Sequence, residues 1–247
     1  MSNLTAVILA AGRGTRLGTA LDGKPKGFLP FKDTTFIERA LDILALANVA
    51  QTVIVTGHNA EFYESLANER GPSVVTLHNP EFVNKGSMQS LRVALEALTG
   101  GLLVMDADIV YERRAILDMV QSIEDNAILL SNISGAGDEN FAWSVLDGGA
   151  NERITHISKD IHVNANAPSG EHVGIVKIGP NLAQALLQTS ANLQQALPLV
   201  AYEQCLTLLL NTHTMVPVRI PDLIWTEVDD LGMWNRAQES IFPLLRD

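Results

Sequence analysis

Glycines and basic residues alternate directly after the first apolar run of the chain. The apolar residues Val7–Ala11 lead into Gly12-Arg13-Gly14-Thr15-Arg16, and Lys24-Pro25-Lys26 follows eight residues later. Glycines let backbone N–H groups approach an anion closely, and a short, wholly apolar run is typical of a strand buried in a parallel sheet. Residues 13–32 include five basic residues and one acidic residue, although the net charge of the chain is -11. This local reversal of charge predicts a pocket for a polyphosphate.

The glycine loop departs from two better-known phosphate-binding patterns. In the dinucleotide-binding pattern G-x-G-x-x-G, an acidic residue follows about 20 residues later. Here the third glycine, Gly18, comes one position late, and Ile54–Gly57 ends the second strand without an acid. The P-loop pattern does not fit either, because Lys26 lies far beyond the glycines and no serine or threonine follows it. A purely structural turn would leave the basic residues of the loop without a role: Arg13, Arg16, Lys24 and Lys26.

Two carboxylates follow another apolar run. Asp106 and Asp108 come directly after Leu102–Met105. Side chains of an extended chain alternate with a period of two, so both carboxylates lie on one face, at the same edge of the sheet as the glycine loop. Magnesium takes oxygen ligands, usually one or two protein carboxylates together with phosphates and waters. The acids are therefore candidate metal ligands, and the alternatives are a solvated turn or a helix cap.

The hydrophobic pattern places these motifs on alternating strands and helices. Strands are predicted at Ala6–Leu9, Thr52–Thr56, Val74–Leu77, Leu102–Met105 and Ala127–Ser131, and helices at Ile37–Leu46, Ala60–Asn68, Met88–Leu98 and Arg114–Ile123. This alternation is typical of βαβ units, whose loops at the carboxyl ends of the strands bind ligands. Later segments predict antiparallel hairpins at Phe141–Leu146, Ile154–Ser158 and His172–Ile178, helices at Leu182–Leu187 and Tyr202–Leu210, a strand at Thr214–Ile220 and a last helix from about Leu231.

We therefore predict one α/β domain over residues 1–247, with a Rossmann-like, mixed, mostly parallel sheet flanked by helices and a small antiparallel substrate lid. Residues 1–131 would form the nucleotide-binding core, residues 132–230 the acceptor-binding and lid portion, and residues 231–247 a C-terminal helix. The chain is 47% hydrophobic. A chain of this size buries roughly three-quarters of its unfolded surface, which is ample for a core.

The composition argues against several classes of protein. Acidic residues outnumber basic ones by 28 to 17, whereas a nucleic-acid surface needs clustered basic residues. No apolar run approaches the ~20 residues that span a bilayer, and Met1–Thr5 lacks the features of a leader, so we expect a cytoplasmic protein without membrane insertion. The single cysteine, Cys205, cannot form an internal disulfide and is expected to be a buried apolar side chain. A homodimer remains possible.

The glycine loop resembles that of a known enzyme family. Residues Leu9–Leu17, with Pro25-Lys26, are similar to the signature of GT-A-like nucleotidyltransferases, which join an NTP to a phosphorylated small molecule and release pyrophosphate. The resemblance implies that Arg13 binds the β- and γ-phosphates and that Arg16 and Lys26 act on the reacting phosphates. It assigns nucleotide binding to Leu9, Ala10, Ala11, Gly12, Gly14 and Thr15.

Further segments resemble the cytidylyltransferases for phosphocholine and 2-aminoethylphosphonate, over nearly the whole chain: residues 86–91, 106–112, 137–139, 158–160, 170–175 and 225–230. This resemblance implies Mg2+ bound by Asp108 and, as a second choice, by Asp229. Either Asp229 or Asp230 could be that second ligand, since one of them could cap the next helix. It also implies cytosine recognition by Gly86-Ser87-Met88, where a helix start offers free N–H groups and Ser87 a hydroxyl, although Ser87 could simply be a cap.

Acidic and aromatic residues in the second half of the chain could bind a cationic head group, and they include Phe141, Trp143 and Glu203. The candidates for acceptor binding are Asp138, Glu139, Lys159, Glu171, Tyr202, Trp225 and Glu227. A trimethylammonium group favours an aromatic cage, whereas a primary ammonium needs carboxylate or carbonyl acceptors. The pair Asp138-Glu139 therefore favours an aminoethylphosphonate. Lys159 could bind the phosphonate of the acceptor or form a surface ion pair with Asp160.

Together these residues predict transfer of CMP from CTP to a small phosphonate or phosphate that carries an amine, with 2-aminoethylphosphonate favoured. Phosphocholine or a sugar 1-phosphate is the alternative acceptor. A nucleotide sensor without catalysis is the rival from another class. Such a sensor would be expected to lose Lys26 or a metal carboxylate, and this chain keeps them.

Overall fold

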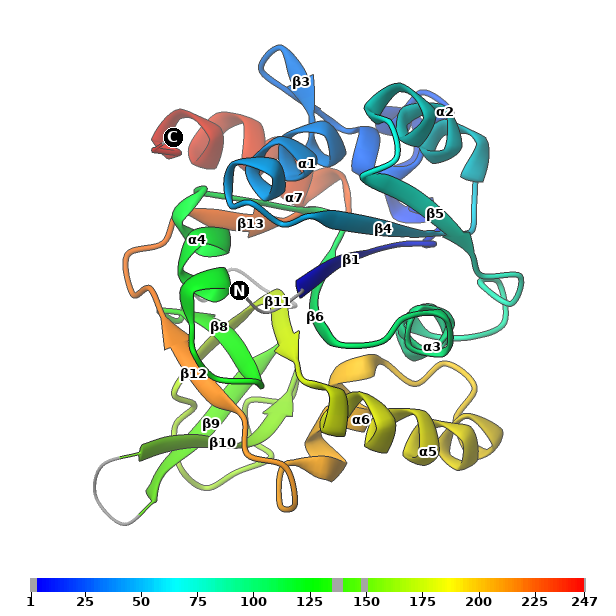
Figure 1. The fold of residues 1–247 in the computed structure, drawn as a ribbon. Coiled ribbons are helices and arrows are strands. Elements are labelled where there is room, and N and C mark those ends of the chain that lie inside the picture. The colour runs from blue at the N-terminus through cyan, green and yellow to red at the C-terminus, as the bar shows by residue number, and fades with distance from the viewer. Residues whose placement is uncertain (1–3, 135–139, 148–150, 247) are drawn as a thin grey trace.

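A mixed sheet runs through the molecule (Figure 1). The computed structural model describes residues 4–134, 140–147 and 151–246. Within them nine strands form the sheet, with the order β10-β9-β11-β6-β1-β4-β5, while β8 pairs with β11 and β12 pairs with β8. The predicted class, a mixed α/β sheet with flanking helices, is confirmed.

The two halves of the sheet differ in strand direction. Strands β1 (Leu4–Ala10), β4 (Gln51–Thr56), β5 (Val74–His78) and β6 (Gly101–Asp106) are parallel. Strands β9 (Phe141–Asp147), β10 (Asn151–Ser158) and β11 (Gly170–Ile178) run antiparallel to their neighbours, as does β8 (Ala127–Ser131) to β11, and β12 (Val216–Arg219) is parallel to β8. The parallel strands bring the loops at their carboxyl ends to one edge.

Helices cover both faces of the sheet (Figure 1). One apolar cluster joins α1 (Phe36–Leu46), α2 (Ala60–Arg70) and α4 (Arg114–Gln121), and another joins α3 (Ser87–Ala97), α5 (Pro180–Ala196) and α6 (Tyr202–Leu209). Successive side chains of β1 point to opposite faces of the sheet, so Ile8 packs in the first cluster and Val7 in the second. No helix among the described residues has the length and apolar character needed to cross a membrane.

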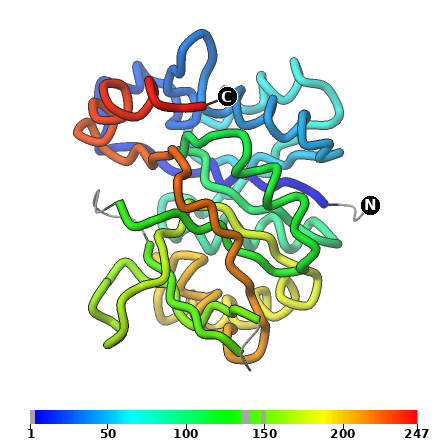
Figure 2. The backbone as a smooth tube through the Cα atoms, turned by 90° about the vertical axis from the view of Figure 1, so that its left-hand side faces the viewer, coloured from blue at the N-terminus to red at the C-terminus, as the bar shows by residue number. Residues whose placement is uncertain are grey.

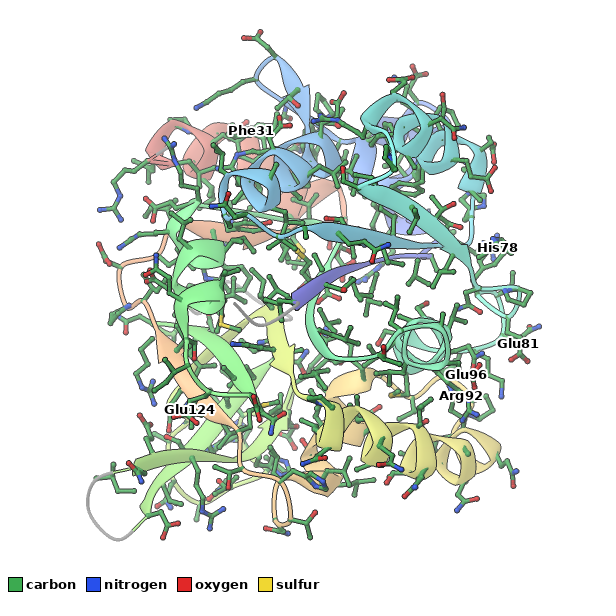
Figure 3. The ribbon with its side chains drawn as sticks, viewed as in Figure 1. Phe31, His78, Glu81, Arg92, Glu96 and Glu124 are labelled. Carbon is green, nitrogen blue, oxygen red and sulfur yellow. The ribbon has the colours of Figure 1, made fainter. Side chains whose placement is uncertain are left out.

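Polar contacts help to join α3 to α5. Arg92, labelled in Figure 3 beside Glu96, pairs with Glu96 at 2.8 Å and donates a hydrogen bond to the carbonyl of Leu187 on α5 at 3.4 Å. The apolar sides of the same helices pack in one cluster. The hydrogen bond from Arg92 to Leu187 therefore supplements a contact that is mainly hydrophobic, and the pair with Glu96 lies within α3.

The C-terminal segment packs against the glycine loop, far away in sequence. Helix α7 (Leu231–Arg236) continues as a π-helical turn (Ala237–Ile241) and a 3-10 turn (Phe242–Leu244). Trp234 joins Leu17 and Phe36 in an apolar cluster, and Leu17 belongs to the 3-10 segment η1 (Thr15–Leu21). Figure 2 shows the red end of the chain beside the first blue segments. The C-terminus thus supports the loop that carries Arg16.

Short ribbons complete the described fold. Strands β2 (Pro30–Phe31) and β3 (Thr34–Thr35) pair after the 3-10 turn η2 (Lys26–Phe28), and β7 (Ile109–Tyr111) pairs with β13 (Trp225–Glu227).

Two predicted elements differ from the structure. The segment His172–Ile178 was expected in a peripheral hairpin, yet it belongs to β11, which lies beside β6 inside the main sheet and is buried along its length. The alternation of apolar and polar residues along a strand does not reveal which strands will pair with it. The prediction that this segment lies at the periphery of the sheet was therefore wrong. The helix expected at Leu182–Leu187 spans Pro180–Ala196. Its second half was missed because exposed polar residues such as Gln188 and Asn192 interrupt the apolar pattern.

Candidate active site

A cavity of about 710 Å³ lies at the carboxyl edge of the parallel strands. Its walls come from the glycine loop after β1, the acidic segment after β6 and the start of α6. Several predicted residues line it: Leu9, Ala10, Ala11, Gly12, Arg13, Gly14, Thr15, Arg16, Lys26, Gly86, Ser87, Asp108, Lys159, Tyr202, Glu227 and Asp229. The sheet thus brings together side chains that are up to 220 positions apart, from residue 9 to residue 229.

The glycine loop has a backbone shape that only glycine adopts easily. Gly14 has a φ of 60°, in the left-handed region, and precedes the 3-10 segment that begins at Thr15. A Cβ at Gly14 would lie 2.8 Å from Leu21 Cδ1 and 2.9 Å from Lys26 Cγ. The loop therefore packs directly on the aliphatic stem of Lys26, and this close contact fixes where the ammonium group lies.

Lys26 projects into a group of carboxylates. Its Nζ lies 2.8 Å from Asp108 Oδ2 and also donates to Asp229 Oδ1. Burial alone would lower the pKa of Lys26, but the charges of Asp108 and Asp229 outweigh it and raise the pKa above its usual value. The backbone next to Lys26 is held by buried Tyr63, whose hydroxyl accepts a hydrogen bond from the Gly27 N–H at 3.3 Å. Lys26 is thus a positioned cation at every physiological pH.

The ribbon of β7 and β13 joins the two acidic segments. Glu227 is the register partner of Ile109, and the Val228 N–H donates to the Asp108 carbonyl at 2.9 Å. This pairing carries Asp229 next to Asp108. Arg16 adds a second cation, since its Nη2 lies 2.5 Å from Asp229 Oδ2.

The neighbouring residues Asp229 and Asp230 make different contacts. Asp230 begins α7, and its Oδ1 accepts a hydrogen bond from the Met233 N–H at 2.9 Å, which is an N-cap contact. Asp229 faces the cavity and pairs with Lys26. Of the two aspartates considered as the second metal ligand, Asp229 therefore lies at the cavity and Asp230 at the helix start.

Three carboxylates have the chemistry of a site for a hard divalent cation. Asp108, Glu227 and Asp229 each offer an oxygen, and these oxygens lie within 4.8 Å of one another. Burial, together with the charges of Asp108 and Asp229, raises the pKa of Glu227 well above its usual range. Burial also tends to raise the pKa of Asp229, but Lys26 and Arg16 lower it overall. A group of oxygen donors with excess negative charge fits Mg2+.

The region expected to recognise the base is built differently from the prediction. The Gly86 N–H donates to the Pro198 carbonyl at 3.0 Å and the Met88 N–H to the Val200 carbonyl at 3.3 Å, so these groups are not free donors. Met88, in the first turn of α3, is wholly buried and does not line the cavity. The close approach that Gly86 permits is to the backbone of residues 199–200, because a Cβ there would lie 2.3 Å from the Val200 carbonyl oxygen.

Ser87 connects the same region to α6. Its Oγ accepts a hydrogen bond from the Tyr202 N–H at 3.1 Å, so it caps α6 rather than its own helix. Ser87 and Gly86 still line the cavity, where Phe82 and Lys85 join them. Sequence reasoning did not single out Phe82 or Lys85, which lie in the loop between β5 and α3.

A buried polar network also lines the cavity. Tyr202 OH donates to Asp106 Oδ2 at 3.3 Å and lies 3.2 Å from His172 Nε2, and Asn140 Nδ2 donates to Glu203 Oε1 at 3.0 Å. Burial raises the pKa of Glu203 to about 7 and lowers the pKa of His172 to about 4. Burial, with the charge of Glu203, also raises the pKa of Asp106 well above its usual range. Two buried carboxylates, those of Asp106 and Glu203, therefore lie in this network.

Two predicted acceptor residues lie elsewhere. Glu171 alternates with His172 along β11, so its side chain lies on the other side of the strand, where Oε1 accepts a hydrogen bond from the Ser134 N–H at 2.8 Å. The indole of Trp225 donates to Ser131 Oγ at 2.8 Å, outside the cavity lining. Asp138 and Glu139, also predicted, lie outside the described residues. Glu203, which the sequence also offered for binding a cationic head group, lies in the first turn of α6 and does line the cavity.

The structural comparisons define the class of the fold, which is that of nucleotidyltransferases. The chain is similar to CTP:phosphocholine cytidylyltransferase from Streptococcus pneumoniae, with a TM-score of 0.76 and 17% identity over 97% of this chain and 99% of that one. It is also similar to the inositol-1-phosphate CTP transferase from T. maritima, with a TM-score of 0.79 and 18% identity over 97% and 94% of the two chains.

Residues 6–188 match the family model described as the MobA-like NTP transferase domain, and the chain belongs to that family. It is 26% identical, over 96% of its length, to CMP-5'-(3-aminopropyl)phosphonate synthase from Streptomyces rubellomurinus. It is 33% identical, over 42% of its length, to 2-aminoethylphosphonate cytidylyltransferase from Lancefieldella rimae. These matches cover 39% and 43% of the two relatives, so the chain spans about two-fifths of their length.

Proposed function

We propose that the chain transfers CMP from CTP to a small phosphonate that carries an amine, with 2-aminoethylphosphonate as the favoured acceptor. A phosphonate oxygen attacks the α-phosphorus of CTP, a new P–O bond forms, and the bond from the α-phosphorus to the bridging oxygen breaks. That oxygen leaves with its electron pair as part of pyrophosphate. No covalent bond to the protein is needed.

One observation carries the proposal: Lys26 lies between the glycine loop and the carboxylates of Asp108 and Asp229. A cation at the meeting point of an anion-binding loop and a metal-type cluster suits phosphoryl chemistry, which depends on positioning and charge neutralisation. Lys26 would stabilise the negative charge that develops at the α-phosphorus. Arg13 and Arg16 would hold the triphosphate and the leaving pyrophosphate.

The carboxylates would hold Mg2+, with Asp108 and Asp229 as the principal ligands and Glu227 beside them. When bound, Mg2+ would supply charge neutralisation to the phosphate oxygens. Without it, the same carboxylates pair with Arg16 and Lys26. Those pairs would hold both cations close to the position that the phosphates occupy.

Acceptor preference follows from the polar network of the cavity. The described aromatic residues on the lining are Tyr63, Phe82, His172 and Tyr202. Tyr202 is almost wholly buried, and Trp225 lies away from the lining, so an aromatic cage for a trimethylammonium group is not supported. Buried carboxylates suit a primary ammonium better. The named activities of the two phosphonate relatives agree with this preference.

A pyrophosphate-release assay tests the proposal. The four NTPs would each be combined with 2-aminoethylphosphonate, 3-aminopropylphosphonate, phosphocholine and glucose 1-phosphate, in the presence of Mg2+. We expect the highest kcat/KM for CTP with 2-aminoethylphosphonate. A preference for phosphocholine or the sugar phosphate would refute the acceptor, and silence in every combination would favour a nucleotide sensor.

A further inference from the structure

One oxygen of the buried Glu203 carboxylate accepts no hydrogen bond from the described residues. Glu203 lies in the first turn of α6, is 8% exposed and lines the cavity. Oε1 accepts the hydrogen bond from Asn140 Nδ2, at 3.0 Å, whereas Oε2 is buried and receives no hydrogen bond from any described residue. A carboxylate oxygen in this position normally has a donor, because leaving it unmet costs free energy.

The surroundings of Glu203 disfavour its negative charge. Two further carboxylates, those of Asp106 and Glu227, line the same cavity, and burial raises the pKa of Glu203 to about 7. The charge of Lys159 opposes this effect, but burial outweighs it. The net field at this end of the cavity therefore favours an incoming cation.

We infer that Glu203 is the residue that selects the primary ammonium group of the acceptor. This inference rests on the proposed function, which it deepens by assigning the head-group contact. The ammonium carries three N–H donors, so one can bond the unmet Oε2 while the others reach further oxygens. Lys159, which lines the same cavity, would provide the opposite charge for the phosphonate. The two side chains would thus match the two charges of a zwitterion.

The contact also determines which acceptors fail. A trimethylammonium group has no N–H donor and would leave Oε2 unmet. An alkylphosphonate without an amine would leave the whole carboxylate uncompensated, since a site built to bind a charged group discriminates against the analogue that lacks it. Glu203 is thus inferred to determine specificity, and the chemical step would depend on other residues.

A comparison of two acceptors tests the inference. kcat/KM would be measured at saturating CTP for 2-aminoethylphosphonate and for ethylphosphonate, in the wild type and in Glu203→Gln. We expect the substitution to lower kcat/KM for the amine by about 30-fold or more, as for loss of one member of a buried charge pair. The value for ethylphosphonate should not fall, because that acceptor makes no contact with the carboxylate and the variant removes the uncompensated charge.

Two controls separate this role from a structural one. Glu64→Gln removes a carboxylate from the exposed side of α2 and should leave both acceptors unaffected. Glu203→Gln keeps an oxygen for Asn140 and removes a charge that the fold disfavours, so its Tm at pH 8 should equal or exceed that of the wild type. An equal loss for both acceptors, or a lowered Tm, would overturn the inference.

Binding without nucleotide separates failure of the inference from failure of the proposed function. Titration calorimetry would compare 2-aminoethylphosphonate with ethylphosphonate on the wild type and Glu203→Gln. If the wild type releases no pyrophosphate with any acceptor, the proposed function fails, and binding of the amine that depends on Glu203 still supports the subsite. If the amine binds equally well to both proteins, the subsite is refuted whatever the activity.

Discussion

The ammonium of Lys26 lies 2.8 Å from Oδ2 of Asp108, 82 positions further along the chain. Two local features produce this contact. Gly14 packs on the stem of Lys26, and Asp108 follows β6 at the same edge of the sheet. The ion pair joins the basic loop to the acidic segment, so a change on either side alters the electrostatics of the other.

Lys26→Ala should lower kcat by roughly 10²-fold or more, by analogy with removal of one oriented donor from a transition-state site. The reason is the loss of a buried cation where negative charge develops. Steady-state kinetics with CTP and 2-aminoethylphosphonate measure the effect. Arg70→Ala removes a cation from a surface pair with Asp42 and should have little effect on turnover. Turnover of Lys26→Ala near the wild-type rate would reject the role of Lys26.

Asp229→Asn and Asp230→Asn form a matched pair of neighbouring, isosteric changes. Asp229→Asn should weaken Mg2+ binding and lower Mg2+-dependent turnover by about 10²-fold, because it removes a charged oxygen from the cluster with Asp108. Asp230→Asn should preserve both, since asparagine caps a helix about as well as aspartate. Mg2+ titration calorimetry and kinetics distinguish the two. The reverse pattern, with the metal lost from Asp230→Asn, would contradict the assignment.

Much of the fold follows from the sequence because its strong signals are local. The run before Gly12 and the run before Asp106 each specify a buried strand followed by a polar loop, and parallel strands bring their loops to one edge. Asp229 is different. It reaches the site because β13 pairs with β7, and that pairing of two three-residue strands leaves no local pattern.

The missed parts of the site depend on long-range packing. The sequence predicted that Gly86 permits a close approach to the base. The structure does show a close approach at Gly86, but the group that approaches it is the backbone at Val200. Likewise, the polar side chain that alternates toward the cavity on β11 is His172 and not Glu171, and the register that decides this comes from the neighbouring strands β6 and β8. Single-residue chemistry does not reveal such partners.

Gly86→Ala should destabilise the protein by about 1–3 kcal/mol, the usual cost of forcing extra atoms into a packed site. A Cβ at residue 86 would lie 2.4 Å from the Leu199 carbonyl oxygen, so the segment leading to Tyr202 must move. We also expect a higher KM for the acceptor. Denaturant unfolding and kinetics measure both effects. Gly101→Ala is the control, because its Cβ meets only Leu4 Cδ1, at 3.4 Å, and an unchanged KM in Gly86→Ala would argue against this coupling.

His172 should make the protein less stable as the pH falls. Burial lowers its folded-state pKa to about 4 from 6.5, although the bond to the Leu129 carbonyl opposes the shift. Between these values the unfolded chain takes up a proton that the folded chain refuses, so the stability present above pH 6.5 is lost progressively toward pH 4. From pH 7 to pH 5 the loss should be about 2 kcal/mol. Nearby Glu203, whose pKa is raised, titrates in the opposite sense.

The His172 effect is therefore measured as a difference between proteins. Urea unfolding of the wild type and of His172→Gln at pH 7 and pH 5 cancels the contribution of Glu203, and the variant should lack the 2 kcal/mol or so that the imidazole contributes to the pH dependence. His162→Gln changes an exposed histidine and should keep the wild-type dependence. If His172→Gln lost as much stability on acidification as the wild type, the imidazole that contacts Tyr202 would not be the titrating group.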